Sequence, residues 1–360
     1  MNISYKAKEI TDNCRFCWMC RHVCPIGNAT GHERNTARAR AFVVSMVERG
    51  ATGLVEVSDN IYECSLCGAC TNNCVTGFDP KVFVQEVKTE IIMSGVTPTY
   101  IMKLIETYVT SGNVYGMSTP ESLKPYFKKG GDTLLLAGQD AFYKAPEAVK
   151  SALELLGGAG MTPDFTDEQD SGAALWFLTG KTEETRAAAK KLADTLNSYK
   201  TVVVYDPTDL KLMLHEYKEW GIELNCKAVS FNEYLLGLIN DGAIAVKKSK
   251  KEYSLQDHFA YARELDDSES GRRLIEKVGK AKEMLLIGKE ANLAGMLIMA
   301  EYMPRVIEAV AKNRWIDAKN MGVTTLVTEN PAEYVALKAT TPEGCRVISV
   351  EEMILENLKK

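Results

Sequence analysis

The sequence lacks the features that mark membrane proteins and nucleic-acid-binding proteins. Its 360 residues contain no uncharged apolar run of the roughly 18 to 20 residues that a membrane span needs. The formal net charge is −5, and without an excess of positive charge we expect no nucleic-acid partner. The N-terminus, MNISYKAKEI, has no signal-peptide pattern. These absences predict a cytoplasmic protein without a transmembrane span, and they leave peripheral association with a membrane open.

Histidines and nucleotide-binding motifs are equally scarce. Only four histidines are present, and they are too scattered to predict a catalytic set. No G-x-G-x-x-G follows an expected strand, and the GGAG at 157–160 falls at the end of an expected helix, where glycine commonly ends helices. We therefore expect no flavin or nicotinamide site in this chain.

Cysteine, in contrast, is concentrated in two short motifs. Eight of the ten cysteines lie there, and the absence of an export signal argues against a disulfide framework. The first motif reads C-x-x-C-x-x-C-x-x-x-C-P and the second repeats this spacing without the proline, a pattern typical of two-cluster ferredoxins. Zinc also takes four thiolates, but its sites usually come as two separated C-x-x-C pairs, so zinc is the minority interpretation. The motifs consist of Cys14, Cys17, Cys20 and Cys24, and of Cys64, Cys67, Cys70 and Cys74.

The spacing also predicts which cysteines share a cluster. In two-cluster ferredoxins the fourth cysteine of each motif binds the other cluster. We therefore expect two [4Fe-4S] clusters that form a short wire, because each motif contributes to both clusters and so fixes their separation. The expected ligands are Cys14, Cys17, Cys20 and Cys74 for one cluster, and Cys64, Cys67, Cys70 and Cys24 for the other.

The rest of the chain alternates short apolar runs with amphipathic helical patterns, which favours βαβ units and parallel sheets. The fold class that we expect is α+β and multidomain: a helical ferredoxin-like domain at 1–125, then a duplicated α/β domain at 126–245 and 246–360. Residues 247–270 look like a connecting segment with at most a short helix. The expected strands are 133–138, 174–179, 201–206 and 227–231 in the first unit, and 284–288, 324–328 and 346–350 in the second; the expected helices are 145–156, 182–196, 210–220, 232–239, 294–311, 331–339 and 351–358.

Two stretches, CRFCWMCRHVCPIGNATGHERNTARARA and IYECSLCGACTNNCVTGFDPKVFVQEVKTEIIMSG, resemble the cluster-binding domain of the heterodisulfide reductase and glycolate oxidase iron-sulfur subunit family. The resemblance covers most of residues 10–95. It implies an all-helical two-cluster domain followed by two repeats that often end in Cys-Cys-Gly and that bind a further cluster or form part of a substrate site.

In this chain the corresponding repeats have lost their thiols. Asp170-Ser171-Gly172 stands at the first Cys-Cys-Gly, while Asp206-Pro207-Thr208-Asp209 and Asn330-Pro331-Ala332-Glu333 stand where cysteines would follow a strand. Only Cys226 and Cys345 remain beyond residue 74, too few for a further cluster. The resemblance thus implies degenerate repeats, and carboxylates at former thiol positions leave a hard cation open.

For function, the resemblance implies an electron-transfer subunit of a multisubunit oxidoreductase, without catalytic residues of its own. Its partners would be a flavoprotein of the FAD-linked dehydrogenase type and a further electron acceptor. One alternative is a catalytic reductase whose repeats hold a substrate through Asp170, Asp206, Asp209 and Glu333. Another is a structural adaptor of an electron-bifurcating or membrane-associated assembly.

Three arginines that follow the first motif, Arg34, Arg38 and Arg40, have near-helical spacing. They predict either a positive patch beside the clusters, suited to an acidic partner, or an ordinary solvated helix face.

Overall fold

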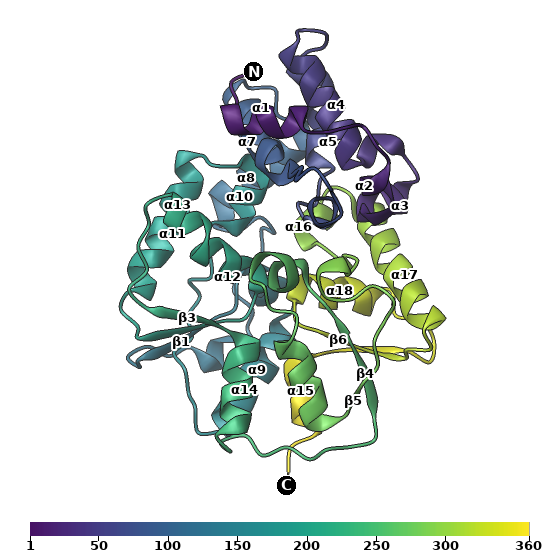
Figure 1. Cartoon of the computed structure of the whole chain (residues 1–360). Coiled ribbons are helices and arrows are strands. Elements are labelled where there is room, and N and C mark those ends of the chain that lie inside the picture. Colours follow the sequence, from purple (N-terminus) through teal and green to yellow (C-terminus); the bar gives the residue numbers. More distant parts are fainter. Residues whose placement is uncertain (360) are drawn as a thin grey trace.

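A computed structural model describes residues 1–359 of the chain (Figure 1). It is 54% helical, with parallel sheets, which confirms the α+β multidomain fold. An all-helical part forms the upper region of Figure 1, above two α/β lobes. Among residues 1–359, no helix is long and apolar enough to cross a membrane. The domain boundaries near residues 125 and 245 stay predictions.

The N-terminal part is built from short helices around the cysteine motifs. The helix α3 begins at Pro25, directly after Cys24, because proline at the first helical position costs no hydrogen bond and has a suitable φ. The longer α7 packs against α1 and α5 and buries Phe83 and Val87, forming the core of this part. The helices are α1 (Tyr5–Asp12), α2 (Met19–Val23), α3 (Pro25–Thr30), α4 (Ala37–Glu48), α5 (Leu54–Tyr62), α6 (Ala69–Asn72), α7 (Pro80–Met93) and α8 (Thr99–Ser111), with 3₁₀ turns η1 (Glu33–Asn35) and η2 (Lys124–Tyr126).

The first lobe surrounds a three-stranded parallel sheet in the order β1-β2-β3. The runs TLLL and TVVV of β1 and β2 are buried on both faces, as expected for parallel strands covered by helices. Its elements are β1 (Thr133–Leu136), the π-helix η3 (Asp140–Lys144), α9 (Pro146–Gly158), α10 (Ala173–Thr179), α11 (Glu183–Leu196), β2 (Thr201–Val204), α12 (Pro207–Leu214), α13 (Glu216–Glu219), β3 (Lys227–Ser230) and α14 (Phe231–Asn240).

The second lobe surrounds a four-stranded parallel sheet in the order β5-β4-β6-β7. Its elements are β4 (Glu252–Gln256), the π-helix η4 (Ala260–Glu264), α15 (Ser270–Val278), β5 (Lys280–Ala281), the 3₁₀ turn η5 (Gly288–Glu290), α16 (Leu297–Ala300), α17 (Pro304–Asn320), β6 (Thr325–Thr328), α18 (Pro331–Ala339), β7 (Arg346–Ser349) and α19 (Val350–Glu356).

The two lobes repeat one layout. In each, the first strand leads into a π-helix, η3 or η4, and the last strand ends in a serine that caps the next helix, Ser230 or Ser349. The helices α9 and α19 pack together across the two lobes, as do α14 and α15. At the centre, Asn330 Nδ2 after β6 donates to Asp206 Oδ1 after β2 at 3.1 Å. The carboxyl ends of both sheets therefore meet, which is where ligands bind in open parallel sheets.

Four expectations about individual elements are wrong. Residues 174–179 belong to the helix α10; the run AALWFLT is too short and apolar for periodicity to separate a buried helix from a strand. No strand covers 284–288, and the segment 247–270 contains β4 instead. The sequence pattern does not reveal that strand because its buried residues include Ser254 and Gln256. The expected helix at 294–311 is divided at Pro304 into α16 and α17.

Candidate functional site

The first group of cysteines lies at the surface of the helical part. Cys17 is exposed, while Cys14, Cys20 and Cys74 are partly buried. Burial raises the pKa of the Cys14 thiol, and the neighbouring Cys17 and Cys74 thiols raise it further. Cys74 thus lies beside Cys14 although it belongs to the other motif, and its Sγ is 3.3 Å from Thr76 Oγ1.

The second group of cysteines is deeper. All four of its members, Cys24, Cys64, Cys67 and Cys70, line one cavity of about 370 Å³. The pKa of the Cys24 thiol is raised to about 11, mainly by burial and further by Cys67 and Cys64. The structure thus brings together the two sets that the crossed pattern predicts, while their role as cluster ligands stays a prediction.

No three His, Cys, Asp or Glu side chains within residues 1–359 converge closely enough to hold a single metal ion. The four ligands of a cubane cluster bind four different iron atoms. They stand farther apart than the ligands of one ion, whose sulfurs lie about 2.3 Å from a shared zinc. The finding therefore concerns sites for a single ion only.

Both cysteine loops have the same backbone strain. Phe16 and Leu66 occupy matching places, one residue before the second cysteine of each motif, with φ of 52° and 57°. A left-handed conformation at a residue other than glycine costs on the order of 1 to 3 kcal/mol and tends to occur at functional sites. The Phe16 amide donates to the Cys14 sulfur and lowers its pKa. The strained residue therefore belongs to a loop whose backbone N–H points toward a cysteine sulfur.

Two buried cations lie beside the second group. Arg40, 1% exposed, lines the cysteine cavity; its Nε donates to the Asn60 carbonyl at 3.0 Å and its Nη1 to the Asn35 carbonyl at 2.5 Å. Its buried Nη2 has no partner within residues 1–359. Lys88 is fully buried, and burial lowers its pKa to about 7, against the opposing effect of Cys64. Both cations would compensate the negative charge of a cluster in this cavity.

The arginines do not form the single patch that their spacing suggested. Arg40 is buried and does not reach the surface, so this prediction is wrong for that residue. Arg34 forms an ion pair with Glu63 at 2.6 Å. The Arg38 guanidinium lies 4.4 Å from the centre of the Trp18 ring, beside the first cysteine group.

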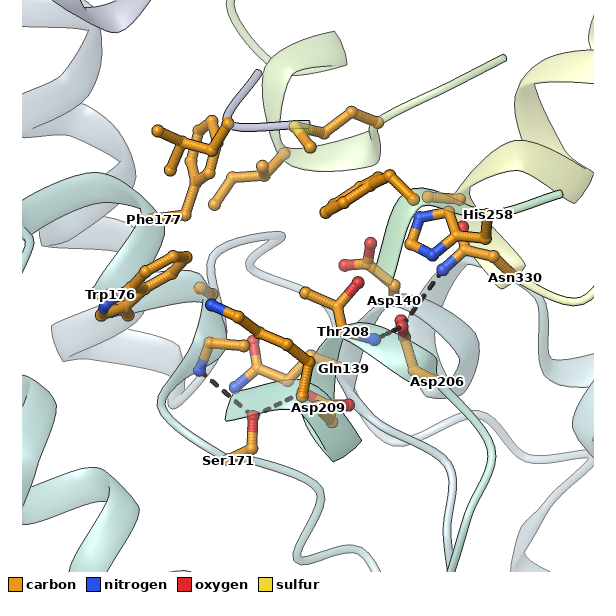
Figure 2. A pocket seen from close by; sticks show the side chains of 18 of the residues that line it. Gln139, Asp140, Ser171, Trp176, Phe177, Asp206, Thr208, Asp209, His258 and Asn330 are labelled. Atoms are coloured by element: carbon orange, nitrogen blue, oxygen red, sulfur yellow. Dashed lines mark hydrogen bonds between the residues drawn. The ribbon is translucent and has the colours of Figure 1, made fainter. Parts of the chain in front are cut away.

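A pocket lies between the two lobes and the helical part. Figure 2 shows its side chains, with the carboxyls of Asp206 and Asp209 below Phe177. The ends of four parallel strands supply much of its wall: Gln139 and Asp140 follow β1, Asp206 and Asp209 follow β2, His258 follows β4 and Asn330 follows β6. Ser65, Leu66 and Lys81 of the helical part line both this pocket and the cysteine cavity.

The carboxyls of the pocket are buried and close to one another. Asp206 Oδ1 accepts from the Thr208 amide at 2.8 Å and from Asn330, while Ser171 Oγ donates to Asp209 Oδ1 at 2.5 Å. Burial, with the charge of Asp140, raises the pKa of Asp206 to about 7. Burial, with the charge of Asp206, raises the pKa of Asp209 well above its usual value. Some of these groups therefore hold a proton near neutral pH.

The opposite wall is apolar, and the pocket has no free positive charge among its described residues. Lys81 is paired with Glu264 and Lys211 with Glu216. Burial, together with the charge of Arg263, lowers the pKa of His258 to about 3, so its imidazole is neutral. The apolar wall consists of Leu66, Trp176, Phe177, Phe259, Met296 and Ile298.

Three of the four carboxylates singled out from the sequence, Asp170, Asp206 and Asp209, line this pocket. Glu333 lies instead within the second lobe, where its Oε1 accepts from the Ala294 amide at 2.9 Å and from Gln256 at 3.1 Å. Asp140 and His258 were missed. Asp140 was detectable from the sequence, because polar residues directly after a parallel strand belong to the ligand-binding edge. His258 was not, because the strand before it, β4, was not predicted.

We expect replacement of Asp206 by asparagine to stabilise the protein above pH 7. The pKa of this carboxyl rises from its ordinary value of 3.8 to about 7 in the folded protein, so the folded state binds more protons and loses stability as pH rises between these values. Asparagine can keep both hydrogen bonds without the charge. The variant should gain on the order of 2 kcal/mol at pH 8 relative to pH 5, at about 1.4 kcal/mol per pKa unit.

Thermal unfolding of Asp206→Asn and wild type at pH 5 and pH 8 checks this. Asp241→Asn, at an exposed position after α14, is the control and should leave the pH dependence unchanged. Equal destabilisation of Asp206→Asn at both pH values would contradict the expected protonation.

Comparison with known proteins identifies the cysteine region. Residues 10–78, which include both motifs, match the family model of a 4Fe-4S dicluster domain. No curated protein matches the chain. A hypothetical protein from Helicobacter pylori has a similar fold, with a TM-score of 0.60 and 12% identity over 99% of this chain and 73% of its own.

Two racemases are also similar in part. The chain covers 64% of its length against each: glutamate racemase isoform RacE1 from Bacillus anthracis (14% identity, 80% of that chain, TM-score 0.32) and aspartate racemase from Picrophilus torridus (11%, 97%, 0.30). These two likenesses are too weak to argue from. The family match supports an iron–sulfur protein with an electron-transfer role, while the resemblance to the heterodisulfide reductase and glycolate oxidase iron-sulfur subunit family stays a prediction.

Proposed function

We propose that the chain is an electron-transfer subunit of a multisubunit oxidoreductase, which relays electrons through two [4Fe-4S] clusters between a flavoprotein partner and another acceptor. The observation that supports the proposal is the arrangement of the cysteines: one group lies at the surface and one lies deeper, and each lies beside a cysteine of the other motif. Electrons that enter at the exposed group then have a short route inward.

The surface around Cys17 suits a docking partner. It exposes several large apolar side chains, which we call the docking patch: Phe16 (43% exposed), Trp18 (50%), Met19 (52%), Phe42 (47%) and Val75 (89%). Arg21 and Arg38 lie against the Trp18 ring, with Glu33 as their ion-pair partner. An apolar centre with a cationic rim fits a partner whose own rim is acidic. The flavoprotein itself is implied by the family resemblance alone.

Reduction by a small acidic flavoprotein tests this proposal. Flavodoxin hydroquinone is the probe, and cluster bleaching in a stopped-flow instrument is the signal, with iron content matched between samples. Arg21→Glu/Arg38→Glu should slow the second-order reduction by about tenfold or more at low salt, because charge complementarity acts mainly on association. Added salt should slow the wild-type reaction.

Arg273→Glu/Arg305→Glu, which makes the same charge change at exposed positions of the second lobe, is the matched control. Equal rates for both double variants, without dependence on salt, would argue that electrons do not enter at the docking patch. A sample with zinc and little sulfide would overturn the electron-transfer proposal altogether.

One observation favours the alternative of a catalytic reductase. The pocket that holds Asp170, Asp206 and Asp209 adjoins the second cysteine group, through the shared lining residues Ser65, Leu66 and Lys81. The purified chain would then turn over a substrate without its partner, whereas a pure relay would not. Among the described residues, no feature specifically favours the structural adaptor.

A further inference from the structure

The pocket between the lobes lies between the cysteine cavity and a second, polar cavity. On one side, Ser65 and Leu66 separate it from Cys24, Cys64, Cys67 and Cys70. On the other side, Gln139 and Asp170 line both the pocket and the polar cavity of about 1290 Å³. Electrons can therefore arrive through one wall and protons through the other.

The side chain of Gln139 gives a second indication that the pocket binds a ligand. Its side chain is 7% exposed, and its Nε2 donates to the Gly112 carbonyl at 3.2 Å, which fixes the orientation of the amide. Its Oε1 is buried and has no partner within residues 1–359. A buried acceptor left unpaired costs about 1 to 3 kcal/mol, and a hydroxyl or N–H of a bound molecule would remove this cost.

We propose that this pocket is the site where a small, uncharged ring compound is reduced by two electrons and two protons. The inference rests on the proposed function, since the electrons come through the second cluster. An uncharged molecule fits because both lysines of the pocket are paired with glutamates, which leaves an anion without a counter-charge among the described residues. A flat ring fits because three aromatic side chains, Trp176, Phe177 and Phe259, line the pocket together with the carboxyls.

The chemical step balances for a ring that carries two carbonyls. The second cysteine group would hold the cluster that supplies the two electrons one at a time, and the flavoprotein partner would be the source of these electrons through the first group. Two protons come from the carboxyls of Asp206 and Asp209, so that both C=O groups become C–OH. The product then offers O–H donors to Gln139 Oε1 and to the new carboxylates.

Asp170 lies at the boundary between the pocket and the polar cavity, because it lines both. Asp170 Oδ2 accepts from Tyr108 at the polar cavity, and the adjoining Ser171 donates its hydroxyl hydrogen to Asp209. Asp170 thus lies between the polar cavity and the carboxyls of the pocket. We assign it the role of a relay for protons.

The test uses 2,3-dimethyl-1,4-naphthoquinone, whose ring is blocked against addition of thiols, and anthraquinone-2-sulfonate as a fused-ring anion. Calorimetry on the oxidised holoprotein should show binding of the uncharged probe and at least tenfold weaker binding of the anion. Ala174→Trp, which fills the pocket, should abolish binding, while Ala51→Trp on the exposed turn after α4 should not. Hydrogen exchange of wild type should show that the probe protects residues 171–179, which keeps the test valid where Ala174→Trp fails to fold.

Asp170→Asn separates proton delivery from binding. It should bind the probe as wild type does, but reoxidation of the reduced clusters by the probe should slow by roughly a hundredfold, the lower end of what proton transfer contributes. The solvent deuterium effect on this reaction should increase. Clusters present with equal binding of both probes, or with no protection of residues 171–179, would overturn the inference and leave the proposed electron relay intact. Absence of clusters would instead overturn the relay itself.

Discussion

Replacement of Cys24 by alanine is expected to remove the same cluster as replacement of Cys67, and to leave the cluster of the first group in place. Reconstituted wild-type protein should hold about eight iron and eight sulfide per chain, and each variant about four, since a cubane with three thiolates in a buried cavity is poorly held. The physical reason is that Cys24 lines the cavity of Cys64, Cys67 and Cys70 although it closes the first motif. Iron and sulfide analysis on anaerobic samples, with EPR spectra of the dithionite-reduced protein, measures the result.

The identity of the lost signal decides between crossed and uncrossed ligation. Cys24→Ala and Cys67→Ala should leave identical EPR spectra, and Cys74→Ala should match Cys14→Ala instead. Cys226→Ala and Cys345→Ala, outside both motifs, are the controls and should keep about eight iron, as two intact cubanes require. If Cys24→Ala instead lost the signal that Cys14→Ala loses, each motif would hold its own cluster and the crossed assignment would be wrong.

The sequence indicated cluster binding because four cysteines at these short gaps are typical of two-cluster ferredoxins, while the assignment of each cysteine to a cluster stays a prediction. It could not show that Phe16 and Leu66 adopt left-handed backbone, because neither residue type prefers that conformation and only the packed loop imposes it. Nor could it distinguish Arg40 from Arg34 and Arg38. Their spacing along the chain is regular, but only the fold shows that Arg40 points inward, to the carbonyls of Asn35 and Asn60.

Some residues of the pocket were predictable from the sequence, but their assembly into one pocket was not. Asp206 and Asp209 stood out because the family resemblance places them where cysteines would follow a strand, and a parallel sheet places such residues at one edge. That this edge faces Leu66 depends on how the helical part packs on the lobes, and no local pattern encodes it. Glu333 shows the converse: it matches Asp209 in the repeat, yet it serves the interior of the second lobe through Gln256 and Ala294.

We expect loss of the charge at Arg40 or Lys88 to lower the reduction potential of the second cluster. A reduced cluster carries one more negative charge than an oxidised one, and these buried cations stabilise that charge more than solvent-exposed ones do. A unit charge about 4 Å away is worth about 4 kcal/mol at an effective dielectric constant of 20, so the shift should be on the order of 100 mV. Potentiometric titration followed by EPR measures it in Arg40→Gln and Lys88→Met.

Two variants are needed because each substitution also removes hydrogen bonds, and the two substitutions remove different ones. Arg40→Gln leaves one of the carbonyls of Asn35 and Asn60 without its donor, whereas Lys88→Met removes only the bond to the Phe177 carbonyl and keeps the apolar shape. A shift to more negative potential in both, with the first cluster unchanged, assigns the effect to charge. Arg49→Gln, exposed at the end of the same helix α4, should shift neither cluster. Unchanged potentials in Lys88→Met would mean that the side chain of Lys88 is neutral in the wild-type protein. Because the pKa of Lys88 is about 7, repeating the titration at pH 6 tests this explanation.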